Sequence, residues 1–573
     1  MTSEKRDARV LNLYDQLIEI EQRLIPTGLH ILGQPSDPAE RADMLRMIAS
    51  FDRPEAGVRA LPDLVCDGLG LERYEEILRS APRDEVSRSK QQRIDGIVSE
   101  SAREFVNKGT DAAVKFLETN ANVPSDQAAP VFAMLEGISR QLTTNNELES
   151  LLRALRGEYI EPGPGADIVQ NPSILPTGRN THAINPYSIP STVAFARAEP
   201  IARSLLERHV AEKGSYPRAI GLVLWGLDNI KTHGEGVAQA LWLLGVRPVR
   251  DALNRVTEVV PIPLEKLKRP RIDVVMTVSG IFRDLFSPTV QLLDKAVRTV
   301  ALLDESPEMN YVRRHVSEEI QDHREFDEAV TRVFSNAPGN YGTNVNFMVM
   351  DSQWEREDTL ADLFVTRKCF AYGRDSAGRS LDGQEARVAM DRALARVEAT
   401  YQNIDTFEIG ITDVDHYFEY LGGISKAVET RAQERPSIYL SDSLSRDARV
   451  RTLEETVRLE TRAKTLNPKW YEGMLKHGFR GVAEIENHVS NTFGWSATAD
   501  AVDDWVYTEV AETFALDEAM LDRLRSLNPH SAQALVTRLL EAHGRGYWDV
   551  DEETLEKLRD ISSSLDDQIE GVA

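Results

Sequence analysis

Two short apolar runs separated by a helical stretch constrain the fold of this chain most strongly. AIGLVL covers residues 219–224, and the second run lies within RIDVVMTVSG at residues 271–280. Each run is followed closely by a glycine, and GVAQALWLLG between them has the apolar period of a helix. Strands that alternate with helices form parallel sheets. The pattern therefore predicts an α/β domain whose ligands meet the carboxyl ends of the strands.

Changes in composition divide the chain into four predicted regions. Residues 1–156 have helical periodicity, broken at GQPSDP and TTNNE. Residues 157–195 are rich in Gly and Pro, and because apolar residues are interspersed among them we favour an ordered loop over a disordered linker. Residues 196–335 form the α/β domain, and residues 336–573 are predicted to be mainly helical. The predicted fold class is mixed α/β and helix-rich: a parallel α/β domain flanked by helical domains, with a long Gly/Pro-rich ordered loop.

Charge and cysteine content exclude several classes of protein. The 573 residues include 67 Lys and Arg against 92 Asp and Glu, a formal net charge of −25. Nucleic-acid binding needs clustered basic residues, and no segment here is strongly basic. The two cysteines, Cys66 and Cys369, lie far apart and outside any metal-binding spacing, which favours a reducing cytoplasm. No leader segment and no apolar run of about 18 residues is found, so we expect at most peripheral membrane association.

Several common catalytic motifs are absent from the sequence. It has no G-x-x-x-x-G-K-[ST] and no G-x-G-x-x-G, so ATP would have to be bound by another subunit. It also has neither HExxH nor GxSxG, which removes the usual basis for a zinc protease or a serine hydrolase.

The densest polar cluster follows the first apolar run, in WGLDNIKTHGEG. Asp228, Lys231, Thr232, His233 and Glu235 fall within eight positions there. His233 and Glu235 offer a proton acceptor or a hard oxygen ligand side by side. The alternative is an ordinary helix N-terminus, with Thr232 as the cap and Glu235 closing a capping box. The pattern alone favours the alternative slightly.

A second candidate cluster, PTGRNTHAINP, lies in the Gly/Pro-rich region and contains Arg179 and His182. An arginine in an ordered loop is well placed for bidentate contact with a ligand carboxylate. An exposed arginine is equally often only solvated, and the residues leave both readings open.

Several long motifs resemble those of the cobaltochelatase large-subunit and magnesium chelatase H-subunit family. The residues that carry the resemblance occur in the family's order from about Gly157 to the C-terminus: EPGPGADIVQNPSILPTGRNTHAINP, YPRAIGLVLWGLDNIKTHGEGVAQALWLLGVRPV, RPRIDVVMTVSGIFRDLF, SNAPGNYGTNVN, LNPKWYEGMLKHGF and AVDDWVY. DNIKT, FGWSAT and SPEMNYVRRH are similar to the magnesium branch. Family members are far longer, so the resemblance implies that this chain matches only their C-terminal half.

The resemblance implies an ATP-dependent metal–nitrogen ligase that works in the synthesis of chlorophyll or bacteriochlorophyll. Such a subunit binds protoporphyrin IX and inserts Mg²⁺, which enters as a substrate, while partner AAA+ subunits bind and hydrolyse ATP. We expect this chain to be inactive without the N-terminal half and those partners. The nearest alternative is a cobaltochelatase subunit that inserts Co²⁺ into a corrinoid in cobalamin synthesis. A non-catalytic scaffold that docks the ATPase subunits is the other.

The candidate site residues are assigned on the same basis. We expect Glu235 and His233 to act in catalysis, with Glu235 also as a metal ligand. Arg179 is assigned to a porphyrin propionate, and the remaining substrate-binding candidates are His182, Asp228, Tyr341 and Asn344.

Overall fold

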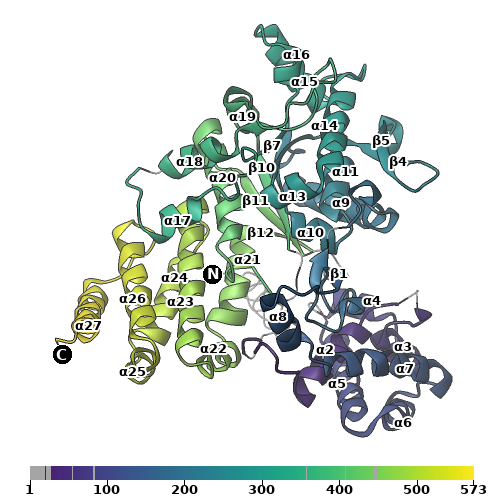
Figure 1. The fold of residues 1–573 in the computed structure, drawn as a ribbon, viewed down its shortest axis with the longest axis vertical. Helices are drawn as coiled ribbons and strands as arrows, with labels where there is room; N and C mark the ends of the chain where they lie inside the picture. Colours follow the sequence, from purple (N-terminus) through teal and green to yellow (C-terminus); the bar gives the residue numbers. More distant parts are fainter. Residues whose placement is uncertain are drawn as a thin grey trace. The chain divides into compact units, whose positions relative to one another are not determined.

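The chain folds into two compact units, each described by itself (Figure 1). The computed structural model describes residue 20 and residues 28–53, 56–81, 84–182, 184–356, 358–404, 406, 408–442 and 449–572. Unit 1 includes His30–His182, and unit 2 includes Leu24–Leu29 and Ala183–Ala573. The units therefore divide inside the Gly/Pro-rich region, and the four predicted regions remain a prediction.

Unit 1 is built from helices around one apolar core. The longest helix, α5, is capped by Asp84, whose carboxylate accepts from the Ser87 amide, and it ends at Gly109 with positive φ. The elements are α2 (Pro38–Ala49), α3 (Leu61–Gly68), α4 (Tyr74–Ser80), α5 (Glu85–Lys108), α6 (Thr110–Ala121), α7 (Ser125–Leu142), α8 (Glu147–Leu155), β1 (Pro162–Pro164), η2 (Pro172–Ile174) and β2 (Asn180–His182).

Side-chain hydrogen bonds hold each part of the Gly/Pro-rich region within its own unit. In unit 1, buried Arg53 donates to the Gln170 carbonyl at 2.5 Å, and Thr177 donates to Glu147 at 2.8 Å. In unit 2, Thr289 donates to the Pro186 carbonyl at 3.1 Å. These contacts fix an irregular backbone that makes few hydrogen bonds of its own.

An eight-stranded sheet forms the centre of unit 2, in the order β12-β11-β10-β3-β6-β7-β8-β9. Neighbours from β11 to β7 pair in parallel, and β12, β8 and β9 pair antiparallel. The strands are β3 (Ala219–Leu224), β6 (Asp273–Val278), β7 (Val333–Ser335), β8 (Phe370–Ala371), β9 (Gln384–Glu385), β10 (Ala399–Ile404), β11 (Ser437–Asp442) and β12 (Val450–Thr452). Five of these strands come from the region predicted to be mainly helical.

Helices cover both faces of this sheet, so β3 and β6 are buried along their whole length. Ile220 and Leu222 pack in one apolar cluster with α9 (Thr192–Lys213), α11 (Glu235–Leu244) and α14 (Ser287–Ala301). Ala219 and Val223 pack in another with α18 (Asp358–Lys368), α20 (Gly423–Ala432) and the C-terminal helices. Burial on both faces explains why the two strands read as continuous apolar runs.

The other elements of unit 2 are mostly helical, and the predicted helix-rich mixed α/β fold class is confirmed. Within the described residues, no helix combines the length and the apolar character needed to cross a bilayer. The remaining elements are η3 (Pro186–Ser188), α10 (Gly226–Lys231), β4 (Val246–Arg250), β5 (Val256–Pro261), α12 (Leu264–Leu267), α13 (Gly280–Leu285), α15 (Tyr311–Gln321), α16 (Phe326–Ala329), α17 (Val345–Met350), α19 (Arg387–Leu394), η4 (Phe418–Gly422), α21 (Leu453–Glu460), η5 (Thr461–Thr465), α22 (Pro468–Leu475), α23 (Phe479–Ala499), α24 (Asp504–Phe514), α25 (Glu518–Leu527), α26 (Pro529–Gly544) and α27 (Glu552–Glu570).

Candidate functional site

The strand order of the sheet locates the candidate site between β3 and β10. After β3 the chain adds β6 and β7 on one side, and it then returns to place β10 and β11 on the other. Open parallel sheets bind ligands outside the carboxyl ends of the strands at such a switch point. The loops there are residues 225–234 after β3 and residues 408–417 after β10.

Glu235 is a buried acid that directly follows the loop after β3. It is the first residue of α11 and is 3% exposed, and its Oε1 lies 3.3 Å from Nε of half-exposed Arg197 on α9. Burial raises the pKa of Glu235 to about 7, against the opposing effect of Arg197. A carboxyl group with this pKa exchanges protons readily near neutral pH.

A buried polar network joins the carboxyl-terminal parts of β10 and β11 to Gln239 on α11. The Tyr401 hydroxyl lies 3.0 Å from Gln239 Oε1, 2.9 Å from Asn403 Oδ1 and 2.7 Å from Ser441 Oγ. Burial raises the pKa of Tyr401, and the nearby charges of Glu235 and Asp228 raise it further. Asp228 is buried as well, with 4% of its surface exposed.

The turn before α11 has features of both predictions made for it. Thr232 Oγ1 accepts from the Glu235 amide at 3.2 Å, as a helix cap would. Gly234 is nevertheless the N-cap, and the Glu235 side chain pairs with Arg197 instead of closing a capping box. His233 is exposed, and its carbonyl accepts from the Ser191 amide at 2.9 Å. The turn is thus a helix start that also buries an acid.

Trp225 joins the loop after β3 to the segment after β10. Its indole Nε1 donates to Gln402 Oε1 at 3.2 Å. The ring centroids of Trp225 and Tyr420 lie 4.4 Å apart, and those of Trp225 and Tyr417 lie 6.1 Å apart. Aromatic packing of this kind holds the two loops together at the switch point.

The segment after β10 contributes a second buried acid, Glu419 on the π-helix η4. Its Oε1 accepts from the Asn344 amide at 3.0 Å, and its Oε2 lies 2.9 Å from His416 Nδ1. Although burial raises the pKa of Glu419, hydrogen bonds from His416 and Thr343 lower it overall. Hydrogen bonding to Glu419 in turn raises the pKa of His416, whose side chain is 62% exposed. The buried Glu419 carboxylate thus favours the protonated form of His416 at the surface.

Lys368 is a buried base beneath the loop after β7. Its Nζ donates to the Val278 carbonyl at 3.1 Å and to Asn336 Oδ1 at 2.9 Å, and it lies 4.1 Å from the centre of the Tyr420 ring. Burial lowers the pKa of Lys368 well below its usual value. Because Lys368 and Glu419 both contact residues 336–344, this Gly- and Asn-rich loop is held in one conformation.

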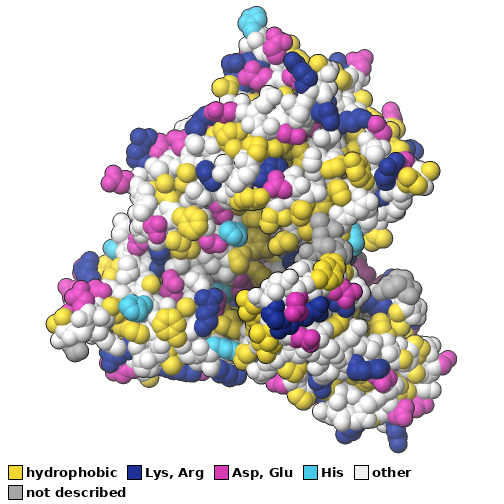
Figure 2. All heavy atoms as spheres, viewed as in Figure 1, with side chains coloured by type: hydrophobic (Ala, Val, Ile, Leu, Met, Phe, Trp, Pro, Cys, Tyr) yellow, Lys and Arg dark blue, Asp and Glu magenta, His cyan; other side chains and the backbone are white. Residues whose placement is uncertain are grey.

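Exposed apolar side chains lie beside these charged groups. Leu227 on α10, Ile281 on α13 and Tyr341 are 51%, 43% and 53% exposed. A Cβ at Gly226 would lie 2.5 Å from Ile281 Cγ2, and one at Gly280 would clash with the Tyr341 ring. The segments that carry these three exposed side chains therefore lie next to one another, and the three side chains are here called the apolar ledge. Hydrophobic side chains are visible over α10, α13 and α17 in Figure 2.

The structure brings together five of the seven predicted site residues. Glu235, Asp228 and His233 share the loop after β3. Tyr341 donates to Asp284 at 2.6 Å in the loop after β7, and Asn344 precedes α17 in the same loop.

The other two predicted site residues belong to unit 1. Arg179 is exposed there and lies against Gly163. His182 ends β2, and its side chain lies outside the described residues. Their roles stay predictions.

Sequence reasoning missed the groups supplied after β10. His416 and Glu419 stand in ITDVDHYFEYLGG, where acids and a histidine directly follow a strand-like run. That density of polar residues resembles the one after β3, and it could have indicated a second group of candidate site residues. In the described part of the chain, no group of three or more His, Cys, Asp and Glu side chains is arranged to hold a metal ion. The role of Glu235 as a metal ligand remains a prediction.

The chain belongs to the CobN/magnesium chelatase family, because a family profile with that description matches residues 1–555. Among curated relatives, magnesium-chelatase subunit ChlH from Oryza sativa subsp. japonica is 44% identical over 99% of this chain and 43% of its own length. The magnesium-chelatase H subunit of Chlorobaculum parvum is 39% identical over 98% of this chain and 45% of its own.

A cobalt-inserting relative has the same fold. The catalytic subunit of cobaltochelatase from Mycobacterium tuberculosis superposes with a TM-score of 0.90 and 35% identity, covering 99% of this chain and 47% of that one. The present chain therefore spans less than half the length of these relatives.

Proposed function

We propose that this chain is part of the porphyrin-binding subunit of a magnesium chelatase. The complete enzyme would insert Mg²⁺ into protoporphyrin IX in the cytoplasm, at the expense of ATP hydrolysed by partner AAA+ subunits, in chlorophyll or bacteriochlorophyll synthesis. Family membership and the similarity to the magnesium-chelatase H subunits support the proposal. The same similarity is the reason to propose AAA+ partners, since the described chain offers no phosphate-binding loop motif.

The observation that carries the proposal is the buried Glu235 carboxyl at the switch point, next to loops that expose an apolar ledge. Metal insertion releases two pyrrole N–H protons for each Mg²⁺ that enters the ring. Glu235, whose pKa is raised to about 7, suits the acceptance of one of these protons near neutral pH. Mg²⁺ gives up its water reluctantly and prefers oxygen ligands, which a carboxylate also supplies.

The apolar ledge suits the flat face of a macrocycle. Leu227, Ile281 and Tyr341 present two aliphatic side chains and one ring on neighbouring loops. Burying them against a porphyrin removes apolar surface from water, at about 25 cal/mol per Å². Protein pockets for cofactor-sized ligands are similarly lined by apolar groups with a few polar ones.

Titration with the soluble analogue deuteroporphyrin IX tests for the binding site. All seven tryptophans lie in unit 2, between Trp225 and Trp548, so quenching of their fluorescence reports this unit. We expect saturable quenching that Ile281→Asp weakens at least tenfold, because the change places a charge on the ledge. Leu302→Asp is the matched control, since Leu302 is 72% exposed at the end of α14. Absence of saturable binding would favour the non-catalytic scaffold.

An insertion assay tests the chemistry. In a full-length subunit that carries this sequence, assembled with its ATPase subunits, Glu235→Gln should abolish insertion while porphyrin binding stays nearly intact. Unchanged turnover would remove Glu235 from the site.

The likeness to the cobaltochelatase structure keeps Co²⁺ insertion into a corrinoid as the second candidate. Parallel assays with Co²⁺ and a metal-free corrinoid distinguish the two reactions.

A further inference from the structure

A cavity of about 400 Å³ lies at the amino ends of the strands in unit 2, the opposite end of the sheet from the candidate site. Residues that directly precede β3, β10 and β11 line it, among them Arg218, Glu398 and Pro436. Residues near the ends of α9, α19 and α20 and from the middle of α15 complete the lining. A volume of this size is in the range of small-molecule pockets.

The lining of this cavity is net positive in a chain whose formal charge is −25. Five Lys and Arg side chains line it against three Glu side chains, and two histidines lie beside them. The five cations come from the ends of α9 and α19, from α15 and from the residues before β3 and β11, so the positive charge is not supplied by a single helix. They are Lys213, Arg218, Arg314, Arg396 and Arg435.

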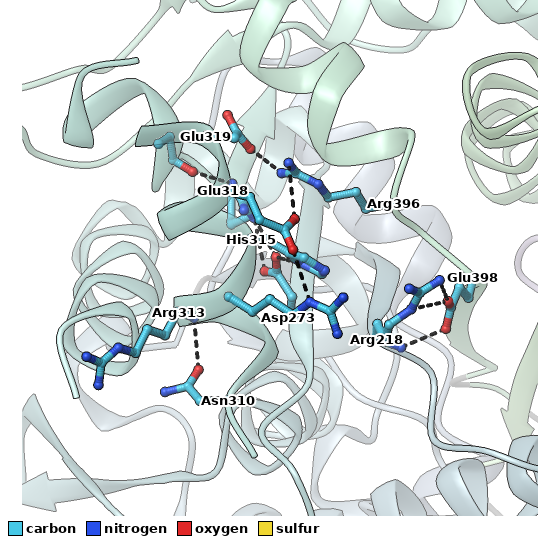
Figure 3. A network of polar contacts seen from close by, with 12 residues as sticks. Arg218, Asp273, Asn310, Arg313, His315, Glu318, Glu319, Arg396 and Glu398 are labelled. Atoms are coloured by element: carbon cyan, nitrogen blue, oxygen red, sulfur yellow. Dashed lines mark hydrogen bonds and ion pairs between the residues drawn. The ribbon is translucent and has the colours of Figure 1, made fainter. Parts of the chain in front are cut away.

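Three of the arginines are held in place by carboxylates and keep unused N–H groups. Arg218 Nε donates to Glu398 Oε1 at 2.6 Å, and Arg314 Nε donates to Glu318 at 3.0 Å. Arg396 pairs with Glu318 and Glu319 (Figure 3). A guanidinium has five N–H donors in a fixed plane, so an arginine with one carboxylate partner still has donors for a ligand.

Lys213 adds an ammonium group to the guanidinium groups that line the cavity. It is exposed at the last turn of α9, and no ion pair with another described residue is formed by its ammonium group. Beside it, buried His209 lies 3.3 Å from the Tyr439 hydroxyl. An ammonium that pairs with no described carboxylate, next to oriented guanidinium groups, is suited to an anion that has oxygens on several sides.

We propose that this cavity binds a small anion with more than one phosphate group, such as pyrophosphate or the phosphate chain of a nucleotide. The spread of cations over five segments matches several anionic groups better than one, and a cation would be repelled. The site is independent of the proposed metal insertion, because it lies at the other end of the sheet.

Calorimetric titration of the full chain with pyrophosphate, at constant ionic strength, tests the proposal. We expect saturable binding that weakens about tenfold in Lys213→Gln and in Arg314→Gln, as the loss of one charge-assisted hydrogen bond predicts. Lys557→Gln is the matched control, because Lys557 is an exposed lysine on α27 that lies outside the cavity. The Lys557→Gln variant should bind pyrophosphate with the affinity of the unmodified chain. A nucleoside diphosphate titrated in parallel distinguishes a bare phosphate chain from a nucleotide.

Lysine acylation read by mass spectrometry provides a second measurement that needs no variant. Pyrophosphate should protect Lys213 from the reagent and leave Lys557 as reactive as before. Equal affinity in all the proteins, or no saturable binding up to millimolar pyrophosphate, would overturn the proposal. So would binding that leaves Lys213 unprotected.

Discussion

The two ends of the central sheet in unit 2 shift the pKa of a buried carboxyl group in opposite directions. At the amino end, Asp273 is buried, and its Oδ2 lies 2.8 Å from His315 Nδ1 (Figure 3). Its Oδ1 lies 2.9 Å from Nε of buried Arg332. Although burial raises it, these two partners lower the pKa of Asp273 well below its usual range. At the carboxyl end, Glu235 is paired with half-exposed Arg197, and burial raises its pKa to about 7.

This difference distinguishes a carboxyl group that stays ionised from one whose charge changes with pH near neutrality. A carboxylate with two buried partners remains ionised at any physiological pH, so Asp273 can only hold structure. A buried carboxyl with one partly solvated partner gains or loses a proton near neutrality, which is what proton transfer needs. β3 (Ala219–Leu224) connects the two environments, since Arg218 directly precedes it and Trp225 directly follows it.

The largest effect is expected from Asp273→Asn. The change leaves Arg332, which is 1% exposed, without its main counter-charge inside the protein. Breaking a buried pair on one side costs about 3–5 kcal/mol of the free energy of unfolding. Urea denaturation followed by tryptophan fluorescence measures it, because all seven tryptophans lie in unit 2. A loss under about 1 kcal/mol would show that the pair is solvated, as exposed pairs are, and would remove the contrast between the two ends.

A pH-dependent effect of about 3 kcal/mol is expected at Glu235. The pKa of this group is raised from 4.5 to about 7 in the folded protein, so the folded state holds the proton more tightly than the unfolded state. The stability that this proton contributes is complete below about pH 4.5 and is lost as the pH rises to 7. Glu235→Gln, which cannot ionise, should remove this decline. Urea midpoints of both proteins at several pH values measure it, and parallel curves would contradict the raised pKa.

β3 and β6 were predictable from the sequence because both faces of each strand are buried. AIGLVL and IDVVMTV read as continuous apolar runs, which few other local structures produce. β10 was missed because three of the six residues of ATYQNI are polar, so no continuous apolar run marks the strand. These buried positions are instead stabilised by polar contacts, such as that of the Tyr401 hydroxyl with Asn403 Oδ1.

The candidate site was only partly predictable because only some of its residues are neighbours in the sequence. Glu235 and Asp228 stand directly after a strand, so their proximity follows from local order in the chain. Glu419 and Lys368 instead contact the loop after β7 from distant segments of the chain, and only the fold brings them there. The resemblance to a known family supplied the reaction, while the position of the acid came from the strand–loop pattern.

A smaller effect, of about 1–3 kcal/mol, is expected from Gly226→Ala at the carboxyl end. The new Cβ would lie 2.5 Å from Ile281 Cγ2 and 2.9 Å from the Phe282 amide nitrogen, so α10 and α13 would have to separate. Since Ile281 belongs to the apolar ledge, deuteroporphyrin affinity should fall together with the unfolding free energy. Gly544→Ala on α26 is the control, because no atom lies within 4 Å of its new Cβ. Equal stability of the two variants would show that the helices accommodate the methyl group.

The smallest effect is expected from Glu398→Gln, at the rim of the amino-end cavity. Its ion-pair partner, Arg218, has a side chain that is 52% exposed, and pairs of this kind contribute about 0–1 kcal/mol to stability. Glutamine still accepts from the Arg218 amide, which Glu398 does at 2.7 Å, so the backbone contact survives. The variant should unfold at nearly the same urea concentration, and it should bind pyrophosphate more tightly because one negative charge has left the lining. A loss above about 2 kcal/mol, beyond the range of exposed pairs, would instead place Glu398 with Asp273, as a charge that holds the sheet together. Glu398 and Asp273, at the amino end of the sheet, would then both have a structural role.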